Sequence, residues 1–341
     1  MSPAPKNVKH VRPGLRQIAE ATGLAVVTVH RVFNSPERVA DKTKEKVFAA
    51  ADRLGYVPDK NAAAMTGKPT GFLGVMLPTL ALANFAATLE GVSSEARGRQ
   101  ILIAETYSDP ETELNVLTEM IGRRPDGLIL GAALDHPRSR KLLEQSAIPV
   151  VRIWENPSEP EDMVAGFDNV EAGAQAARHF LSMGYEQTAF FGGRSDRDVS
   201  RFKGFHAALV NAGAPAPQQV ILEDAIEPPL EDYDVGWIFF DDQARRRTPA
   251  RAVFATSDAT AAAILFEAQR RNINVPERLA ICGFGDLKIA KSVFPALTTI
   301  EAPSRQMGAF AAILVDQRCA GVRPKTLVKL FPTEIIARES G

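Results

Sequence analysis

Cysteine is scarce in this chain, since Cys282 and Cys319 are the only two among 341 residues. Two isolated cysteines form neither a CxxC pair nor a disulfide framework, and this favours a reducing cytoplasm. Cys282 lies within the apolar run Leu279–Phe284, where we expect a buried small hydrophobe rather than a nucleophile. Long apolar runs are also missing, so no segment approaches the ~20 residues of a membrane span. Residues 1–9 lack the apolar core of a signal peptide. We therefore expect a cytoplasmic protein that contacts no membrane.

Signatures of catalysis are missing as well. The chain has five histidines, in no HExxH motif or close pair: His10, His30, His136, His179 and His206. No GxSxG or GxxxxGK[ST] motif occurs, and the pair Gly192-Gly193 alone is a weak phosphate signal. The sequence thus predicts no catalytic residue, no metal site and no cofactor.

A short segment near the N-terminus has the pattern of a helix-turn-helix. Residues 15–34 read as a helix, a tight turn at Gly23 and a second helix, and a further helix ends at Gly55. The apolar positions that can form the inner face are Ile18, Ala19, Leu24, Val29, Val32 and Phe33. Such a unit places its second helix in the major groove of DNA.

The charge distribution supports the same interpretation. The net charge is only −1, yet residues 1–68 hold twelve Lys and Arg against six Asp and Glu. A basic head on an acidic body is typical of a protein that binds the phosphate backbone.

Composition shifts divide the chain into four parts. We expect a mobile basic arm at residues 1–14, the helix-turn-helix domain at 15–58, a hinge helix and linker at 59–70, and a core at 71–341. In the core, short apolar runs alternate with helical stretches, a pattern that predicts parallel sheets with helices on both faces. Expected strands are 72–77, 100–105, 127–130, 149–153, 163–166, 188–191, 252–255 and 279–284; expected helices are 84–97, 111–122, 137–145, 170–183, 199–212, 259–270 and 304–320.

These strands are too many for one doubly wound domain, so we expect two similar halves. In open α/β sheets a ligand lies beyond the carboxyl ends of the strands. Two halves that face each other would enclose it in a cleft.

Specific motifs give the chain a resemblance to the LacI/GalR family of bacterial transcription regulators over nearly its full length. They are Thr28-Val29-His30-Arg31-Val32-Phe33-Asn34, Leu54-Gly55-Tyr56-Val57-Pro58, Gly74-Val75-Met76-Leu77-Pro78, Asp126-Gly127-Leu128-Ile129-Leu130, Arg201-Phe202-Lys203-Gly204-Phe205, Ala255-Thr256-Ser257-Asp258, Ile281-Cys282-Gly283-Phe284-Gly285-Asp286 and Pro295-Ala296-Leu297-Thr298-Thr299-Ile300. Within the family the chain looks most similar to gluconate-operon repressors, through residues 164–169 and 192–197.

The resemblance implies a homodimer with an all-α DNA-binding head and a two-subdomain α/β core of the type I periplasmic-binding-protein kind. Its first subdomain would comprise residues 71–166 and 299–324. Its second would comprise residues 167–298 and 325–341.

Candidate DNA contacts lie on the second helix of the head. Val26 and Val27 at its start offer apolar contacts, such as to a thymine methyl, where the family usually has polar residues. Arg31 either bonds bidentately to guanine or clamps a phosphate. Thr28, His30 and Asn34 are candidate phosphate contacts, which position a protein without reading sequence.

The hinge segment 61–66 is short and rich in alanine, so it is unstable as an isolated helix. The resemblance implies that it folds when two copies meet on DNA. Met65 falls where family members carry a minor-groove wedge; the alternative is that it packs on its own core.

Candidate effector-binding residues follow strands of the core. Arg201 matches the family's ligand-binding arginine and suits a carboxylate or a diol. Asp258 can accept bonds from hydroxyls, while Asp286 either does the same or caps a loop. Phe85 either stacks on a sugar or belongs to the core. Further candidates are Arg194, Asp168 and Asn169, with Glu105 and Tyr107 as weaker ones.

These observations predict a repressor of sugar-acid (gluconate or ketogluconate) metabolism genes. A dimer would bind a palindromic double-stranded operator and respond to a small-molecule effector that favours a closed core and separates the hinges. The alternative is a sugar-binding protein or an α/β sugar-processing enzyme with an incidental basic bundle. The missing signal peptide argues against the first, and the missing catalytic residues argue against the second.

Overall fold

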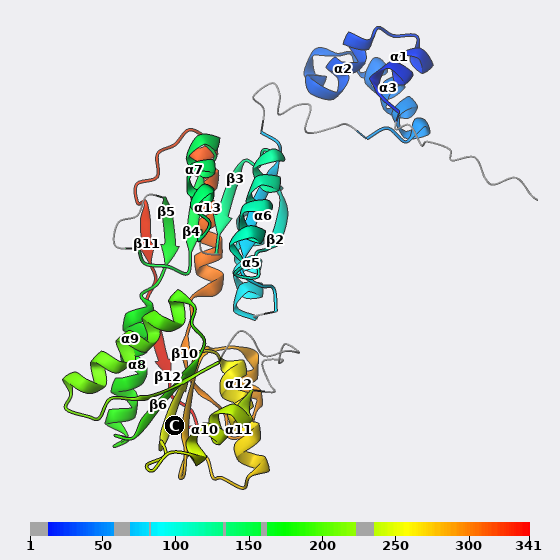
Figure 1. The fold of residues 1–341 in the computed structure, drawn as a ribbon. Helices are drawn as coiled ribbons and strands as arrows, with labels where there is room; N and C mark the ends of the chain where they lie inside the picture. Colours follow the sequence, from blue (N-terminus) through cyan, green and yellow to red (C-terminus); the bar gives the residue numbers. More distant parts are fainter. Residues whose placement is uncertain (1–12, 58–68, 82, 132–133, 158–161, 223–234) are drawn as a thin grey trace, which may run out of the picture. The chain divides into compact units, whose positions relative to one another are not determined.

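The computed structural model describes residues 13–57, 69–81, 83–131, 134–157, 162–222 and 235–341 (Figure 1). The chain forms two compact units, Met1–Gly71 and Phe72–Gly341. The expected arm at 1–14 lies almost wholly, and the hinge segment 61–66 with Met65 entirely, outside the described residues. No helix among the described residues is long and apolar enough to cross a membrane.

The first unit is the predicted helix-turn-helix. Its helices are α1 (Leu15–Thr22), α2 (Val26–Asn34) and α3 (Asp41–Leu54), with a 3-10 turn at Pro36–Arg38. Gly23 follows α1 at φ 65° and Gly55 follows α3 at φ 66°, a left-handed conformation that favours glycine. The small core contains the fully buried Ile18, Val29 and Val47. The three helices that the sequence predicted for this unit are thus confirmed.

The second unit contains two six-stranded sheets. The strands of the first are β1 (Phe72–Leu77), β2 (Gln100–Glu105), β3 (Gly127–Leu130), β4 (Val150–Ile153), β5 (Met163–Gly166) and β11 (Val328–Leu330), in the spatial order β11-β5-β4-β3-β1-β2. The strands of the second are β6 (Thr188–Gly192), β7 (Gln218–Ile221), β8 (Ala252–Ala255), β9 (Ala280–Gly285), β10 (Thr298–Glu301) and β12 (Glu334–Ile336), in the order β12-β10-β9-β8-β6-β7. All pairings are parallel except that between β10 and β12.

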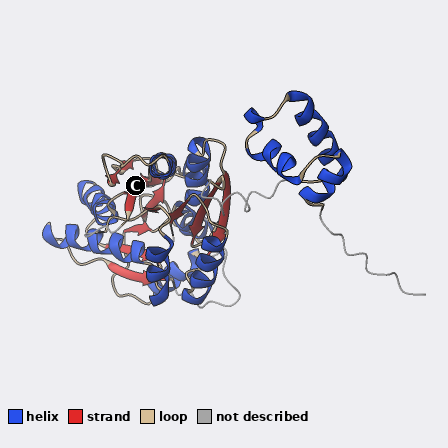
Figure 2. Ribbon diagram, turned by 90° about the horizontal axis from the view of Figure 1, so that it is seen from above, coloured by secondary structure: helices blue, strands red, loops and turns tan. Residues whose placement is uncertain are grey.

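Helices cover both faces of each sheet (Figure 2). They are α5 (Ala83–Glu95), α6 (Pro110–Gly122), α7 (Pro137–Ser146), α8 (Asn169–Ser182), α9 (Asp196–Asn211), α10 (Gly236–Ala244), α11 (Asp258–Arg270), α12 (Lys288–Ser292) and α13 (Ser304–Cys319). Strand alternation explains this layering, because successive side chains point to opposite faces. Val75 packs in the cluster with α5 and α13, whereas its neighbour Met76 packs with α6 and α7. Cys282 is fully buried in the core, as predicted.

The chain passes between the two subdomains at positions that differ from the expected boundaries. Residues 299–301 were expected in the first subdomain, but β10 pairs with β9 in the second sheet. Residues 325–341 were expected in the second subdomain, but β11 pairs with β5 in the first sheet. The boundary therefore falls after Glu301, and the chain crosses once more between β11 and β12. A short strand carries too little pattern to show which of two sheets it joins.

Glycines set the position of α9, whose first turn borders the cleft between the subdomains. Helices α8 and α9 cross at Gly173 and Gly204. A Cβ at Gly173 would lie 1.9 Å from the Arg201 carbonyl oxygen, and one at Gly204 would lie 1.7 Å from that of Val170. Because no side chain fits there, both positions require glycine, and the N-terminus of α9 is held close to that of α8.

Candidate DNA-binding and effector-binding sites

The start of α2 presents an unusual surface for a helix of a small domain. Val27 is 65% exposed and Val26 is also exposed, while Val29 and Val32 on the opposite side are buried. Ala25 precedes the helix without a side-chain cap, as its residue type predicts. Contact between exposed aliphatic side chains and an apolar group such as a thymine methyl is favourable, because it removes apolar surface from water. The start of α2 is therefore suited to contact with another molecule rather than with water alone.

The other candidate DNA contacts lie on the same helix. Arg31 and His30 are exposed, and Thr28 and Asn34 are half-buried. The Asn34 side chain donates to the His30 carbonyl, with 3.0 Å from Nδ2 to O. Arg31 lies one turn after Val27, so its long side chain extends from the same exposed side of the helix.

A large cavity of about 1140 Å³ lies between the carboxyl ends of the first sheet's strands and the loops that precede α8 and α9. Its wall is formed by Pro78, Tyr107, Ser108, Leu134, Asp135, Arg140, Arg152, Trp154, Glu155, Asn156, Pro157, Asp168, Asn169, Val170, Gly193, Arg194, Ser195, Asp196, Arg197, Asp198 and Ser200. Both subdomains thus contribute to one site at the position expected for an α/β ligand cleft.

The cavity wall mixes guanidinium and carboxylate groups. Its arginines are Arg140, Arg152, Arg194 and Arg197, and its carboxylates are Asp135, Glu155, Asp168, Asp196 and Asp198. Burial, together with the charges of Glu113 and Asp196, raises the pKa of Asp135. A wall of this kind offers donors for an anionic group and acceptors for several hydroxyls of one ligand.

Arg197 connects the two sides of the cavity. From the first turn of α9 its Nη2 donates to the carbonyl of Gly131, which follows β3 in the other subdomain. Its guanidinium lies 5.5 Å from the ring centre of Phe85 and 5.9 Å from that of Trp154. Burial lowers the pKa of Arg197. This residue, which the sequence did not single out, is a direct contact between the subdomains.

Trp154 forms the floor beneath Arg197 and was also missed. It is a buried non-glycine residue at φ 71°, a strained conformation that is found mostly at functional sites. Its Nε1 donates to Thr88 Oγ1 over 3.2 Å, and its carbonyl accepts from Asn169 Nδ2 over 3.1 Å. Phe85, 3% exposed, stacks edge-on against it and does not line the cavity. Of the two interpretations of Phe85, the geometry favours the core.

Arg201 lies behind the wall rather than in it, at 6% exposure. Its Nε donates to Asn169 Oδ1 over 3.0 Å and its Nη1 to the Thr256 carbonyl over 2.8 Å. Its guanidinium lies 3.9 Å from the ring centre of Phe284. Burial lowers the pKa of Arg201 to about 10. Asn169 does line the cavity, and its hydrogen bond with Arg201 holds its side chain in place. Arg201 therefore affects the site indirectly, through Asn169.

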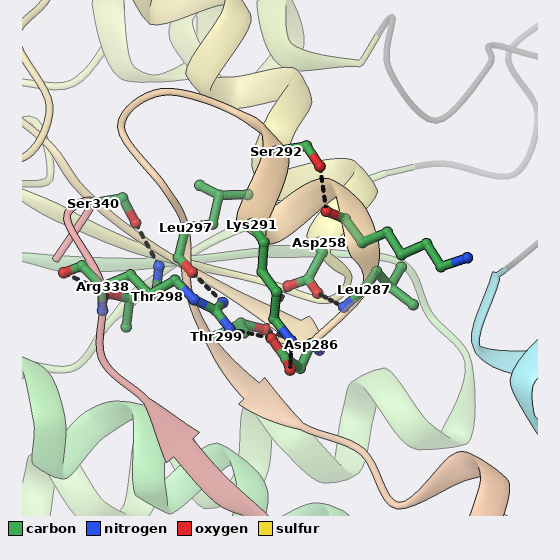
Figure 3. Close-up of polar contacts among 11 residues, drawn as sticks. Asp258, Asp286, Leu287, Lys291, Ser292, Leu297, Thr298, Thr299, Arg338 and Ser340 are labelled. Atoms are coloured by element: carbon green, nitrogen blue, oxygen red, sulfur yellow. Dashed lines mark hydrogen bonds and ion pairs between the residues drawn. The ribbon is translucent and has the colours of Figure 1, made fainter.

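Asp258 and Asp286 also follow strands, but their carboxylates face the protein (Figure 3). Asp258 is fully buried, and it accepts from the backbone N–H of Leu287 over 2.6 Å and from the Thr299 hydroxyl. Asp286 forms ion pairs with Arg338 and with Lys291. Burial raises the pKa of Asp258 to about 6. Neither aspartate lines the cavity. Asp258 connects the segment after β9 to β10, and Asp286 connects that segment to Arg338 near the C-terminus.

The remaining candidate residues also differ in whether they line the cavity. Asp168 caps α8, since its carboxylate accepts from the backbone N–H groups of Val170 and Glu171, and it lines the cavity together with Asn169 and Arg194. Tyr107 lines the cavity at 68% exposure and donates to Glu105 over 3.0 Å. Backbone donation from Leu80, followed by that hydrogen bond from Tyr107, lowers the pKa of Glu105.

Comparison with known proteins agrees with this architecture. A family model described as "Bacterial regulatory proteins, lacI family" matches residues 14–59, and one described as "Periplasmic binding protein-like domain" matches residues 177–341. The HTH-type transcriptional regulator GntR of Escherichia coli K12 is 34% identical over 326 residues, which cover 94% of this chain and 96% of that protein.

Two solved structures share the fold. A LacI-family transcriptional regulator from Silicibacter pomeroyi superimposes with a TM-score of 0.86 at 26% identity, over 96% of this chain and 99% of that one. The lac repressor dimer bound to operator superimposes with a TM-score of 0.78 at 21% identity, over 97% and 99% of the two chains, which shows the fold alone. The helix-turn-helix unit, the two-sheet core and the full-length identity together establish that this chain belongs to the LacI family of bacterial transcriptional regulators.

Proposed function

We propose that this regulator is a repressor of sugar-acid metabolism genes whose effector is a polyhydroxy carboxylate such as gluconate or 2-ketogluconate. The observation that carries the proposal is the mixed wall of the cavity, in which arginines and carboxylates of both subdomains surround one space. An aldonate has one carboxylate and several hydroxyls. The guanidinium groups match the carboxylate, and Asp or Glu oxygens match the hydroxyls.

A neutral sugar fits this wall less well than an acid does. Buried arginines without an anionic partner are costly, because a charged group in a low-dielectric site needs a counter-charge. The cavity volume of about 1140 Å³ lies just above the usual range for small-ligand sites, so a six-carbon acid enters with room for bridging waters.

The mechanism that we propose is a population shift. The lac repressor, whose fold this chain shares, has been solved as a dimer on its operator. By analogy, two copies of this chain would place α2 of each head in the major grooves of a palindromic operator. An effector that contacts both walls of the cavity favours the closed arrangement in which Arg197 reaches Gly131. Because it binds the closed state more tightly than the open one, it changes the DNA affinity of the dimer.

Arg31→Ala tests the DNA-binding half of this proposal. If Arg31 reads a base, the variant should lose about 1–3 kcal/mol on the preferred sequence and should tolerate substitutions at one position of each half-site. The measurement is equilibrium binding to a panel of single-position variants of a DNA site selected from a random library, at one fixed salt concentration. An equal loss on every sequence, including unrelated DNA, would instead show that Arg31 only clamps a phosphate.

Calorimetric titration tests the effector half. Sodium gluconate, 2-ketogluconate, glucose and sorbitol are each titrated into the wild-type protein. Binding of an acid in preference to the neutral compounds supports the proposal, and binding of glucose or sorbitol without either acid refutes it.

A further inference from the structure

One atom of the cavity wall lacks the partner that its charge requires. Arg152 lies in β4, between apolar neighbours. Its Nε and Nη2 donate to the two carboxylate oxygens of Glu155 over 2.9 and 3.0 Å, so this face of the guanidinium is fully used. The remaining nitrogen, Nη1, is buried and makes no hydrogen bond within the described part of the chain. Buried donors are nearly always paired in folded proteins, so an orphaned guanidinium nitrogen needs an explanation.

The charged groups around Arg152 do not provide a hydrogen-bond partner for Nη1. Glu155 forms an ion pair with Arg152 and also interacts favourably with Arg197, whose positive charge Asp198 and Asp196 stabilise as well. Arg152 and Arg197 repel each other across this part of the wall. Asp135 lies near enough to feel the Arg152 charge but forms no hydrogen bond or ion pair with it among the described residues. The neighbouring carboxylates thus interact with Arg152 and Arg197 without accepting a hydrogen bond from Nη1 among the described residues.

Position makes Arg152 different from the other orphaned atoms. Five other buried side-chain atoms in the described residues lack a partner: Glu113 Oε1, Ser139 Oγ, His179 Nε2, Thr188 Oγ1 and Gln218 Oε1. None of these residues lines the cavity, whereas Arg152 does. The clamp by Glu155 fixes the guanidinium plane, so the direction of Nη1 is set before any ligand arrives.

We propose that Nη1 of Arg152 binds the carboxylate of the effector, that Glu155 is its positioning residue, and that this pair makes the regulator select an acid over a neutral polyol. This inference rests on the proposed function, because it assumes that the cavity binds a sugar acid. A guanidinium bond to a carboxylate joins two opposite charges, whereas one to a hydroxyl has only a neutral acceptor, so an acid gains more from this bond in a low-dielectric site. Selectivity then comes from a residue of the first subdomain, opposite Arg194 and the N-terminus of α9.

The test compares two probes that differ mainly in charge. Sodium gluconate and sorbitol are titrated into wild type, Arg152→Gln and Arg152→Lys. We expect Arg152→Gln to weaken gluconate binding about tenfold or more while sorbitol binding changes less than about threefold, since only the charge-assisted bond is lost. Arg152→Lys should recover part of the preference for gluconate. Arg305→Gln is the matched control, because the same substitution is made at an arginine that is 69% exposed and lies outside the cavity wall.

The outcomes distinguish a failure of the proposed function from a failure of the role of Arg152. Wild type that binds neither gluconate nor 2-ketogluconate overturns the proposed function and the inference with it. Wild type that prefers gluconate, together with Arg152→Gln that keeps the same preference, overturns only the role of Arg152. Equal losses in Arg152→Gln and Arg305→Gln also overturn it, because they indicate a general effect of positive charge.

A second variant covers the case in which Arg152→Gln does not fold. Glu155→Gln leaves the arginine in place but loosens its clamp. It should reduce gluconate affinity severalfold and leave sorbitol affinity unchanged. An unchanged gluconate affinity in folded Glu155→Gln would overturn the positioning role.

Discussion

The core contains two polar clusters at the carboxyl ends of its strands, and they differ in whether their charges are already satisfied. In the buried cluster of Figure 3, the Asp258 and Asp286 carboxylates accept from backbone, hydroxyl and cationic groups, with Arg338 from the C-terminal segment among them. In the cavity wall, one nitrogen of Arg152 makes no hydrogen bond within the part of the chain that the structure describes, although Glu155 holds the other two.

The difference separates structure from binding. A cluster whose charged groups already have partners stabilises the fold. An incompletely satisfied one leaves a donor for a molecule from outside. Substitutions in the buried cluster should therefore reduce stability and leave ligand affinity nearly unchanged, and substitutions in the cavity wall should do the reverse.

Arg338→Ala is expected to give the largest effect. It removes a half-buried partner of Asp286 and the donor to the Leu297 carbonyl, which is 2.8 Å away. Removal of one partner from a buried pair costs about 3–5 kcal/mol. Urea denaturation should show this loss, while gluconate affinity of the folded variant changes less than about threefold. Arg305→Ala is the control, because this arginine is 69% exposed and its contact with Glu90 is 3.8 Å long. A variant at Arg338 with full stability and no effector binding would contradict the division into two clusters.

Asp258→Asn should make stability less dependent on pH. The folded-state pKa of about 6 lies above the ordinary value of 3.8, so between these values the folded protein binds more protons than the unfolded chain. Stability from this group is present below pH 3.8 and is lost as the pH rises through 6, a change of about 3 kcal/mol at most.

The measurement is urea denaturation of wild type and Asp258→Asn between pH 4.5 and 8. The stability of wild type relative to the variant should fall across pH 4.5–6.5 and then stay constant. A difference that is the same at every pH would show that Asp258 does not titrate in this range.

Arg201→Lys should give the smallest change in stability and should affect both properties. Lysine retains the positive charge but loses the two directed bonds to Asn169 and the Thr256 carbonyl. Each lost bond costs about 0.5–1.5 kcal/mol, and the freed Asn169 side chain should weaken gluconate binding about tenfold. Paired urea and calorimetric measurements will show whether the two effects occur together. Weakened stability with unchanged gluconate affinity would place Arg201 in the structural group.

The sequence predicted the elements of this molecule better than it predicted where its side chains point. Apolar runs located eight strands, because burial on both faces leaves a clear pattern. The same reasoning placed Asp258 and Asp286 at strand ends, as observed. It did not reveal that both carboxylates turn inward, because their partners lie 29 to 52 residues later in the chain: Leu287 and Thr299 for Asp258, and Arg338 for Asp286.

The short strands β10, β11 and β12 and the helix α10 illustrate the limit for secondary structure. These three strands (Thr298–Glu301, Val328–Leu330 and Glu334–Ile336) are short and lack the continuous apolar run that marked β3 and β8, and their sheet is decided by long-range packing. Arg152 did carry a signal, because it is a charged residue inside the apolar strand Val150–Ile153 and precedes Trp154-Glu155. A buried charge in such a strand is rare enough to mark a site.

Operator binding measured against effector concentration tests the central claim most directly. A DNA site selected from a random library is titrated with the wild-type protein at fixed salt, alone and with gluconate, 2-ketogluconate or sorbitol. We expect an acid to change DNA affinity by about 5- to 150-fold and sorbitol to have no effect, because coupling free energies of about 1–3 kcal/mol are typical. DNA affinity that stays constant while gluconate binds the cavity, or that changes equally with sorbitol, would contradict this claim.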